Sequence, residues 1–188
     1  MLYQLAGMAS MGSYIITFGS NIGDKVRNIE RALILLSRYG TFTNLSRVYL
    51  TESIGASQPD FVNGGFLFHC TLLPLDILKL LKTIELEVGR KPREKWGPRE
   101  IDLDIIWSSF GEFNSSLLVL PHPEWNKRLF VVEILLDLGL KSFYGYTLSD
   151  LKIALKDQVV IPLPCITARF LNLLDYLRTN SLLSENFK

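Results

Sequence analysis

The spacing of hydrophobic residues divides the first part of the chain into alternating strands and helices. Runs rich in β-branched and aromatic residues predict four strands, at residues 14–18, 41–49, 61–72 and 101–107. Apolar residues that recur every three or four positions predict two helices, at residues 24–39 and 74–88. The resulting order is β-α-β-β-α-β, which is the split βαβ arrangement.

Glycines mark the predicted ends and irregularities of these elements. Gly40 and Gly89 each follow a predicted helix and suit its C′ position. The pair Gly64-Gly65 interrupts the third strand and predicts a bulge. Residues 19–23, Gly-Ser-Asn-Ile-Gly, have the strand–turn–helix context of a phosphate loop. They lack the Walker lysine and the full dinucleotide spacing, so turn glycines are the favoured interpretation.

The pattern continues with shorter elements after residue 107. A polar stretch at 108–116 is followed by strands at 117–120 and 159–163 and by helical patterns at 129–138, 147–156 and 166–178. We divide the chain into a leader at 1–12, expected to be disordered, a domain at 13–163 and a helical tail at 164–188. The tail could pack on the domain or form an oligomer contact.

Composition narrows the class of protein. A formal net charge of +1 argues against a general nucleic-acid binder. The two cysteines, Cys70 and Cys165, make neither a disulfide framework nor a zinc pattern, which favours a reducing, cytoplasmic compartment. Only two histidines are present, which excludes a site built from three or more. No apolar run is long enough to predict a membrane span.

The strand predicted from residue 101 carries two carboxylates on one face. Its apolar residues are Ile101, Leu103 and Ile105, and its acidic ones are Asp102 and Asp104. The two aspartate Cα atoms lie about 6.6 Å apart at strand spacing, so their oxygens can converge on one or two hard cations. A metal pair can clamp a phosphoryl group during transfer. Paired acids are also common on solvated strand faces, and the pattern alone leaves that alternative open.

Basic residues lead into this strand. They are Arg90, Lys91, Arg93, Lys95 and Arg99. Beside paired acids they are either structural salt bridges or half of a nucleotide-phosphate site, and the guanidinium of Arg99 is shaped for phosphate oxygens. Glu85 lies near the C-terminal end of its helix, where an acid opposes the helix dipole. That position suggests another role, although a solvated glutamate remains open.

Several segments together resemble the 6-hydroxymethyl-7,8-dihydropterin pyrophosphokinases, enzymes of folate biosynthesis. The long, specific match is Trp96-Gly97-Pro98-Arg99 followed by Asp102-Leu103-Asp104-Ile105. Other family-like segments occur in the same order between about residues 14 and 161: Gly19-Ser20-Asn21, Gln58 to Asn63, Ile84-Glu85, Gly89-Arg90, Pro121-His122-Pro123, Arg128 and Phe130. The resemblance implies a ferredoxin-like α+β fold. Its βαββαβ core is an antiparallel sheet with helices packed on one face, followed by C-terminal additions.

The resemblance also implies an activity and a set of site residues. The family transfers diphosphate from ATP to the pterin hydroxymethyl group and releases AMP. Asp102 and Asp104 would hold two Mg²⁺ ions, and Arg99 would act with them in catalysis. Residues matching ATP contacts are Glu85, Arg90, Arg93, Trp96, Arg99, His122 and Arg128. Residues matching pterin contacts are Thr51, Ile54, Phe61, Asn63 and Phe130.

The chain departs from the family pattern at three places. Pro123 stands where some members carry an aromatic residue, so no ATP contact is assigned to it. Glu52-Ser53 follow Thr51 where the family often has a proline. The basic loop is one residue shorter than in some members, which leaves Lys91 and Arg93 as alternatives for its second cation.

Two alternative functions stay under consideration. A non-catalytic ferredoxin-like module that binds protein or RNA is disfavoured, because the chain lacks a basic surplus and an exposed aromatic RNA-reading pattern. The chain could instead be one part of a bifunctional folate enzyme. From the resemblance, we expect the partners to be two small molecules, ATP and a dihydropterin. We expect no nucleic acid or membrane partner, and a possible link to a neighbouring folate-pathway enzyme.

Overall fold

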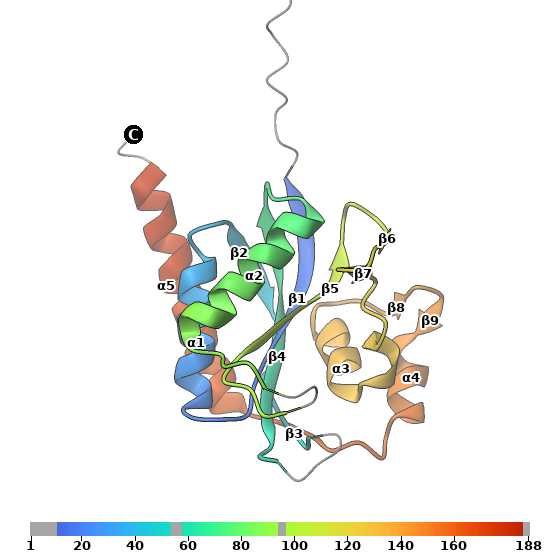
Figure 1. The fold of residues 1–188 in the computed structure, drawn as a ribbon. Helices are drawn as coiled ribbons and strands as arrows, with labels where there is room; N and C mark the ends of the chain where they lie inside the picture. The colour runs from blue at the N-terminus through green and yellow to red at the C-terminus, as the bar shows by residue number, and fades with distance from the viewer. Residues whose placement is uncertain (1–10, 54–57, 94–96, 186–188) are drawn as a thin grey trace, which may run out of the picture.

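The computed structural model describes residues 11–53, 58–93 and 97–185, with side chains up to residue 180. Its centre is a six-stranded antiparallel sheet in the order β10-β3-β4-β1-β5, with β2 also paired to β4. These strands are β1 Gly12–Ser20, β2 Thr41–Leu45, β3 Tyr49–Thr51, β4 Phe61–Cys70, β5 Asp102–Ser108 and β10 Val160–Pro162. The helices are α1 Lys25–Leu36, α2 Pro74–Val88, α3 Leu129–Asp137, α4 Leu148–Ala154 and α5 Pro164–Glu185. The predicted βαββαβ core is therefore present, as Figure 1 shows.

One face of the sheet is covered by the two core helices, as predicted, together with α5 (Figure 1). Alternate residues of the strands point to this side and are buried: Tyr14, Ile16, Phe18, Phe66, Phe68, Leu103 and Ile105. Residues Ile29 and Leu33 of α1 and Ile77 and Leu81 of α2 belong to the same cluster. The tail helix packs on the domain, because Phe170 and Leu174 belong to the same core.

The opposite face of the sheet is covered over only part of its length. Ile15 of β1 and Ile106 of β5 pack there against residues Val131, Val132 and Leu135 of α3. Helices α3 and α4, which follow the βαββαβ core in the chain, lie on this second side (Figure 1). Towards the start of β5 the same face carries polar residues, because Asp102 and Asp104 continue the alternation that places Ile106 there. An apolar half and a polar half thus share one face.

The predicted bulge at Gly64-Gly65 is wrong. Both glycines pair in uninterrupted register with β1, opposite Phe18 and Thr17. They permit close packing instead. A Cβ atom on Gly64 would lie 2.4 Å from the Phe18 ring, and one on Gly65 would lie 2.7 Å from Ile134. The register shifts occur elsewhere, between Ile15 and Ile16 in β1 and between residues 42 and 44 in β2.

Other boundaries differ from the predictions. The strand predicted at 41–49 is two strands, β2 and β3, and both pair with β4. Helix α1 begins after Asp24, whose side chain accepts a hydrogen bond from the Arg27 amide, but it ends at Leu36 with Ser37 as its C-cap. Gly40 is therefore not at C′. By contrast, Gly89 closes α2 in the left-handed conformation, as predicted.

The segments after β5 contain short elements that the pattern did not reveal. These are β6 Phe113–Asn114, η1 Trp125–Lys127, β8 Ser142–Phe143 and β9 Tyr146–Thr147, whereas β7 Val119–Leu120 lies within the strand predicted at 117–120. Two-residue strands are too short to show a hydrophobic period. Within the described parts of the chain, no helix is long and apolar enough to cross a membrane.

Candidate active site

Strand register brings an amide and two carboxylates into adjacent rows of the sheet. Gly19 of β1 lies between Asn63 of β4 and Asp102 of β5, and Thr17 lies opposite Asp104. A Cβ atom on Gly19 would lie 2.4 Å from the Asn63 Oδ1 atom, so glycine leaves the room in which that amide sits. The absence of a side chain at Gly19 therefore shapes the floor of the site.

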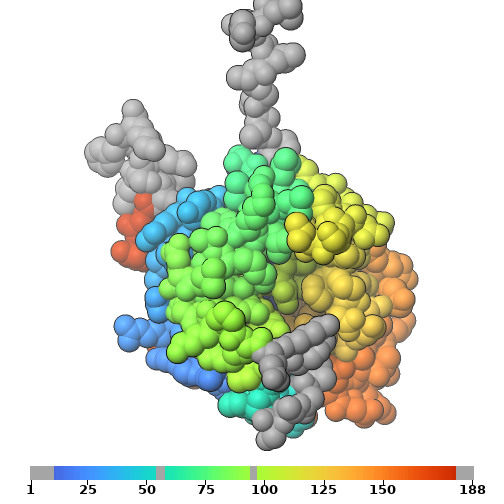
Figure 2. Space-filling view, in the orientation of Figure 1, coloured from blue at the N-terminus to red at the C-terminus, as the bar shows by residue number. Residues whose placement is uncertain are grey.

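This polar half of the sheet is the floor of a cavity of about 670 Å³. In Figure 2 the surface of β5 is set back between the green surface of α2 and the yellow segment that follows β5. Most of the predicted site residues line this cavity: Thr51, Phe61, Asn63, Arg99, Asp102, Asp104, His122, Arg128 and Phe130. Arg90 and Arg93 line a smaller neighbouring hollow of about 160 Å³, which also includes Arg99 and Lys91. Ile54 and Trp96 lie outside the described residues.

Asp102 is held between two guanidinium groups. Arg90 Nη1 donates to its Oδ1 atom at 2.6 Å, and Arg99 Nη1 donates to its Oδ2 atom. Burial opposes ionisation of Asp102, but Arg99 and Arg90 outweigh it and lower the pKa of the carboxyl. Asp102 is therefore ionised at neutral pH, as a metal ligand must be.

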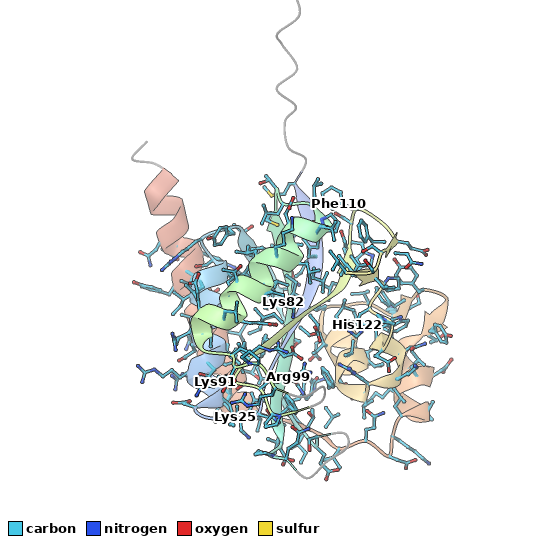
Figure 3. All side chains as sticks on the ribbon, viewed as in Figure 1. Lys25, Lys82, Lys91, Arg99, Phe110 and His122 are labelled. Carbon is cyan, nitrogen blue, oxygen red and sulfur yellow. The ribbon has the colours of Figure 1, made fainter. Side chains whose placement is uncertain are left out.

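Glu85 is buried beneath the cavity and does not line it or the smaller hollow. Its Oε1 atom accepts from the Leu103 amide at 2.8 Å and lies 2.7 Å from Lys82 Nζ, and its Oε2 atom lies 2.7 Å from Arg90 Nη1. Burial raises the pKa of Glu85, against the effects of Lys82 and Arg90. Figure 3 labels Lys82 between α2 and β5. Glu85 thus positions Arg90 and the start of β5, and it does not face the cavity as an ATP contact would.

The basic loop is held by a second acid. Arg93 donates from both Nη atoms to Glu100, at 2.7 and 2.6 Å. This pairing lowers the pKa of Glu100 to about 2. The Lys91 amide also donates to Glu100, at 3.3 Å. Both alternatives for the second loop cation, Lys91 and Arg93, border the smaller hollow.

His122 faces the carboxylates from the loop before α3. Its amide donates to the Ile106 carbonyl at 3.0 Å, and its Nδ1 atom accepts from the Glu124 amide at 3.1 Å. Burial lowers the pKa of His122, Asp104 opposes that shift, and Arg128 adds to it. Figure 3 shows His122 on the α3 side and Arg99 near the start of β5. His122 therefore lines the cavity, and its lowered pKa favours the neutral imidazole.

The other end of the cavity is suited to a flat, polar-edged ring. Asn63 is 5% exposed, and its Nδ2 atom donates to the Thr51 hydroxyl at 2.8 Å. Phe61 and Phe130 line the same cavity, from β4 and from the first turn of α3. Aromatic faces with a fixed amide between strands provide stacking and directed hydrogen bonding.

Asn21 connects the loops around the site, a role that the sequence pattern did not predict. Its fully buried side chain donates to Gln58 and to the Pro59 carbonyl, both at 3.1 Å, and its Oδ1 atom accepts from the Arg99 amide at 2.6 Å. Ser20 adds a bond to the Glu100 carbonyl at 2.6 Å. In the sequence, Gly19-Ser20-Asn21 predicted only a polar turn, and nothing in it identified the hydrogen-bond partners of Asn21.

The donor set at the carboxylates fits magnesium bound together with a nucleotide. Among the described residues, no group of three or more His, Cys, Asp or Glu side chains could hold a metal alone. Mg²⁺ commonly takes one or two protein carboxylates and completes its shell with water and substrate phosphates. Asp102 and Asp104, both on the cavity wall, supply that number.

Comparisons with known proteins show which family the chain resembles. The family model for 7,8-dihydro-6-hydroxymethylpterin-pyrophosphokinase (HPPK) matches residues 15–139. A 2-amino-4-hydroxy-6-hydroxymethyldihydropteridine pyrophosphokinase of Aquifex aeolicus is 34% identical over 157 residues, which is 83% of this chain and 98% of that protein. The protein of the same name from Bacillus subtilis is 36% identical over 126 residues, which is 65% of this chain and 75% of that one.

Longer proteins share the same region. A mitochondrial folate synthesis bifunctional protein of Arabidopsis thaliana is 38% identical over 66% of this chain, but over only 23% of its own length. The crystal structure of Plasmodium falciparum HPPK-DHPS has the same fold, with a TM-score of 0.63 at 14% identity. That match covers 77% of this chain and 44% of the Plasmodium chain. The family model covers more than half of the chain and the Aquifex protein matches along nearly its full length, so this chain belongs to the 7,8-dihydro-6-hydroxymethylpterin-pyrophosphokinase family.

Proposed function

We propose that this protein transfers diphosphate from ATP to the hydroxymethyl group of 6-hydroxymethyl-7,8-dihydropterin, in folate biosynthesis. The observation that carries the proposal is a single cavity with a carboxylate pair and arginines at one end and a fixed amide with aromatic rings at the other. The pterin hydroxyl oxygen forms a bond to the β-phosphorus. The bond from that phosphorus to the α-phosphate bridging oxygen breaks, AMP leaves, and the hydroxyl proton is released.

Asp102 and Asp104 would hold two Mg²⁺ ions together with the ATP phosphates. Bound magnesium supplies charge neutralisation on the phosphate oxygens. The protein's own contribution is positioning. Arg90 and Glu85 hold the start of β5, so the two carboxylates keep their places on the floor of the cavity. The same carboxylates orient the attacking hydroxyl.

The arginines and His122 would receive the phosphates. Arg99 borders both the cavity and the smaller hollow, so its guanidinium can bind a phosphate in either. Arg90, Arg93, His122 and Arg128 surround this region and supply the further contacts. Glu85 acts through Arg90. Trp96 stays a predicted ATP contact.

The pterin would occupy the end beside β4. Asn63 offers amide donors and an acceptor to the ring edge, with the Thr51 hydroxyl beside it. Phe61 and Phe130 supply the stacking faces. Ile54 stays a predicted contact of the same edge.

The experiment measures AMP release from ATP and Mg²⁺ with and without the dihydropterin. We expect AMP only when the pterin is present, and we expect Asp104→Ala to lose nearly all of it while its circular dichroism stays unchanged. The absence of pterin-dependent AMP from the wild-type protein would refute the proposal. RNA binding that weakens steeply with salt, without pterin binding, would instead favour the non-catalytic module.

We also propose how the chain is organised and where it acts. Residues 13–163 would form the pyrophosphokinase domain, with the tail helix as a brace. The free thiols of Cys70 and Cys165 suit a reducing, cytoplasmic compartment. Because the relatives of this chain include bifunctional proteins, a neighbouring folate-pathway enzyme is the physical partner that we propose.

A further inference from the structure

A segment near the end of the chain forms part of the cavity wall. Asp157, Gln158, Val159 and Val160 all line the cavity, although they lie beyond residues 15–139, which the family model matches. The segment runs between α4 and β10 and passes from the start of α3 to the edge of the sheet. It therefore touches both walls between which a pterin and ATP would lie.

Each end of this segment is attached to a different wall. Val160 pairs with Thr51 in the β10–β3 ladder, and the Thr51 hydroxyl accepts from Asn63. At the other end, Gln158 Oε1 accepts from the Leu129 amide at 2.9 Å, and Gln158 Nε2 donates to the Lys127 carbonyl at 2.8 Å. One carboxamide thus holds the main chain on both sides of Arg128.

The start of α3 needs this support. Arg128 is the N-cap residue of the helix, and its side chain makes no capping hydrogen bond. The first amides of a helix have no partner within the helix, so the Leu129 amide depends on Gln158 Oε1 instead. Arg128 and Phe130 flank that amide, and both line the cavity. Any motion of this turn would move a phosphate-facing guanidinium and a ring-facing aromatic together.

We propose that Gln158 is a positioning residue for both substrates: it caps α3 from outside the helix and so fixes Arg128 for the phosphates and Phe130 for the pterin. The inference rests on the proposed function, because it names a residue that arranges the same site. Gln158 acts through Arg128 and Phe130.

The test replaces Gln158 with methionine, which keeps the side-chain length and removes both hydrogen bonds. We expect the KM for ATP and the KM for the pterin each to rise about fivefold to tenfold, the factor that corresponds to losing one ordinary hydrogen bond. Gln158→Glu keeps the acceptor for Leu129 and should give a smaller rise. If Gln158→Met does not fold, Gln158→Glu takes its place as the test variant. Lys156→Ala is the matched control, because this exposed side chain lies two residues away.

A double-mutant cycle separates positioning from general loosening of the fold. The dissociation constant of α,β-methylene-ATP with Mg²⁺ is measured for the wild-type protein, Gln158→Met, Arg128→Ala and the double variant. This binding measurement does not require turnover. If Gln158 acts through Arg128, adding Gln158→Met to Arg128→Ala should change the constant less than twofold. Additive effects, or wild-type KM values in Gln158→Met, would overturn the inference.

The wild-type AMP assay keeps the two proposals distinguishable. If wild-type protein forms pterin-dependent AMP and Gln158→Met has unchanged constants, only the role of Gln158 is lost. If the wild-type protein forms no such AMP, the proposed function itself fails.

Discussion

The buried position of Glu85 allows a sharp prediction about stability. Glu85→Ala removes the acceptor of the Leu103 amide and one of the two carboxylates that pair with Arg90. Breaking a buried ion pair usually costs about 3–5 kcal/mol. Two features reduce that figure here. Arg90 keeps Asp102 as a partner, and the raised pKa of Glu85 shows that burial already disfavours its charge.

We therefore expect Glu85→Ala to lower the free energy of unfolding by about 2 kcal/mol, mainly through the unsatisfied Leu103 amide. For a chain of this length that corresponds to a fall in Tm of about 4–8 °C. The KM for ATP should rise as well, because Arg90 loses its anchor. Urea unfolding followed by circular dichroism, with ATP kinetics on the same samples, provides both measurements.

The same helix supplies the control for this experiment. Glu87 is exposed and lies two residues from Glu85, so Glu87→Ala should stay within about 0.5 kcal/mol of wild type. Glu85→Gln keeps an oxygen for the Leu103 amide and should be less destabilising than Glu85→Ala. If Glu85→Ala and Glu87→Ala unfold at the same urea concentration, the buried network contributes nothing and the reasoning is refuted.

Two further predictions concern Gly19 and Glu100. Gly19→Ala places a methyl group against Asn63 Oδ1, so the pterin KM should rise while the ATP KM stays near wild type; equal rises would contradict this. The folded pKa of Glu100 is lowered from 4.5 to about 2, so its contribution to stability is present above pH 4.5 and is lost as the pH falls towards 2. Glu100→Gln should flatten the decline of the urea midpoint between pH 5 and pH 3, and an unchanged slope would count against the Arg93 pairing.

The local sequence pattern determined which way the strand side chains point and where two helices begin or end. The alternation of Ile101, Leu103 and Ile105 with two aspartates was sufficient to place the aspartates opposite the buried face, because successive strand side chains point to opposite sides. Asp24 and Gly89 marked the limits of their helices for an equally local reason, since capping depends on neighbouring backbone groups. The specific run from Trp96 to Ile105 identified the family by resemblance.

Tertiary structure alone decided which partners these residues have. The sequence placed Asp102 and Asp104 together as candidate metal ligands and left a solvated strand face as the alternative. The hold of Arg90 and Arg99 on Asp102 appears only in the folded chain. Gly64 suggested a bulge and instead makes room for the Phe18 ring.

Asn21 and Gln158 show the same limit most clearly. Asn21 bonds to loops 37 and 78 residues away, and Gln158 bonds to the start of a helix 29 residues before it. A sequence pattern records which face of its own element a residue occupies. It does not record which distant backbone groups lack partners, because strand register and helix docking decide that only when the whole sheet has formed.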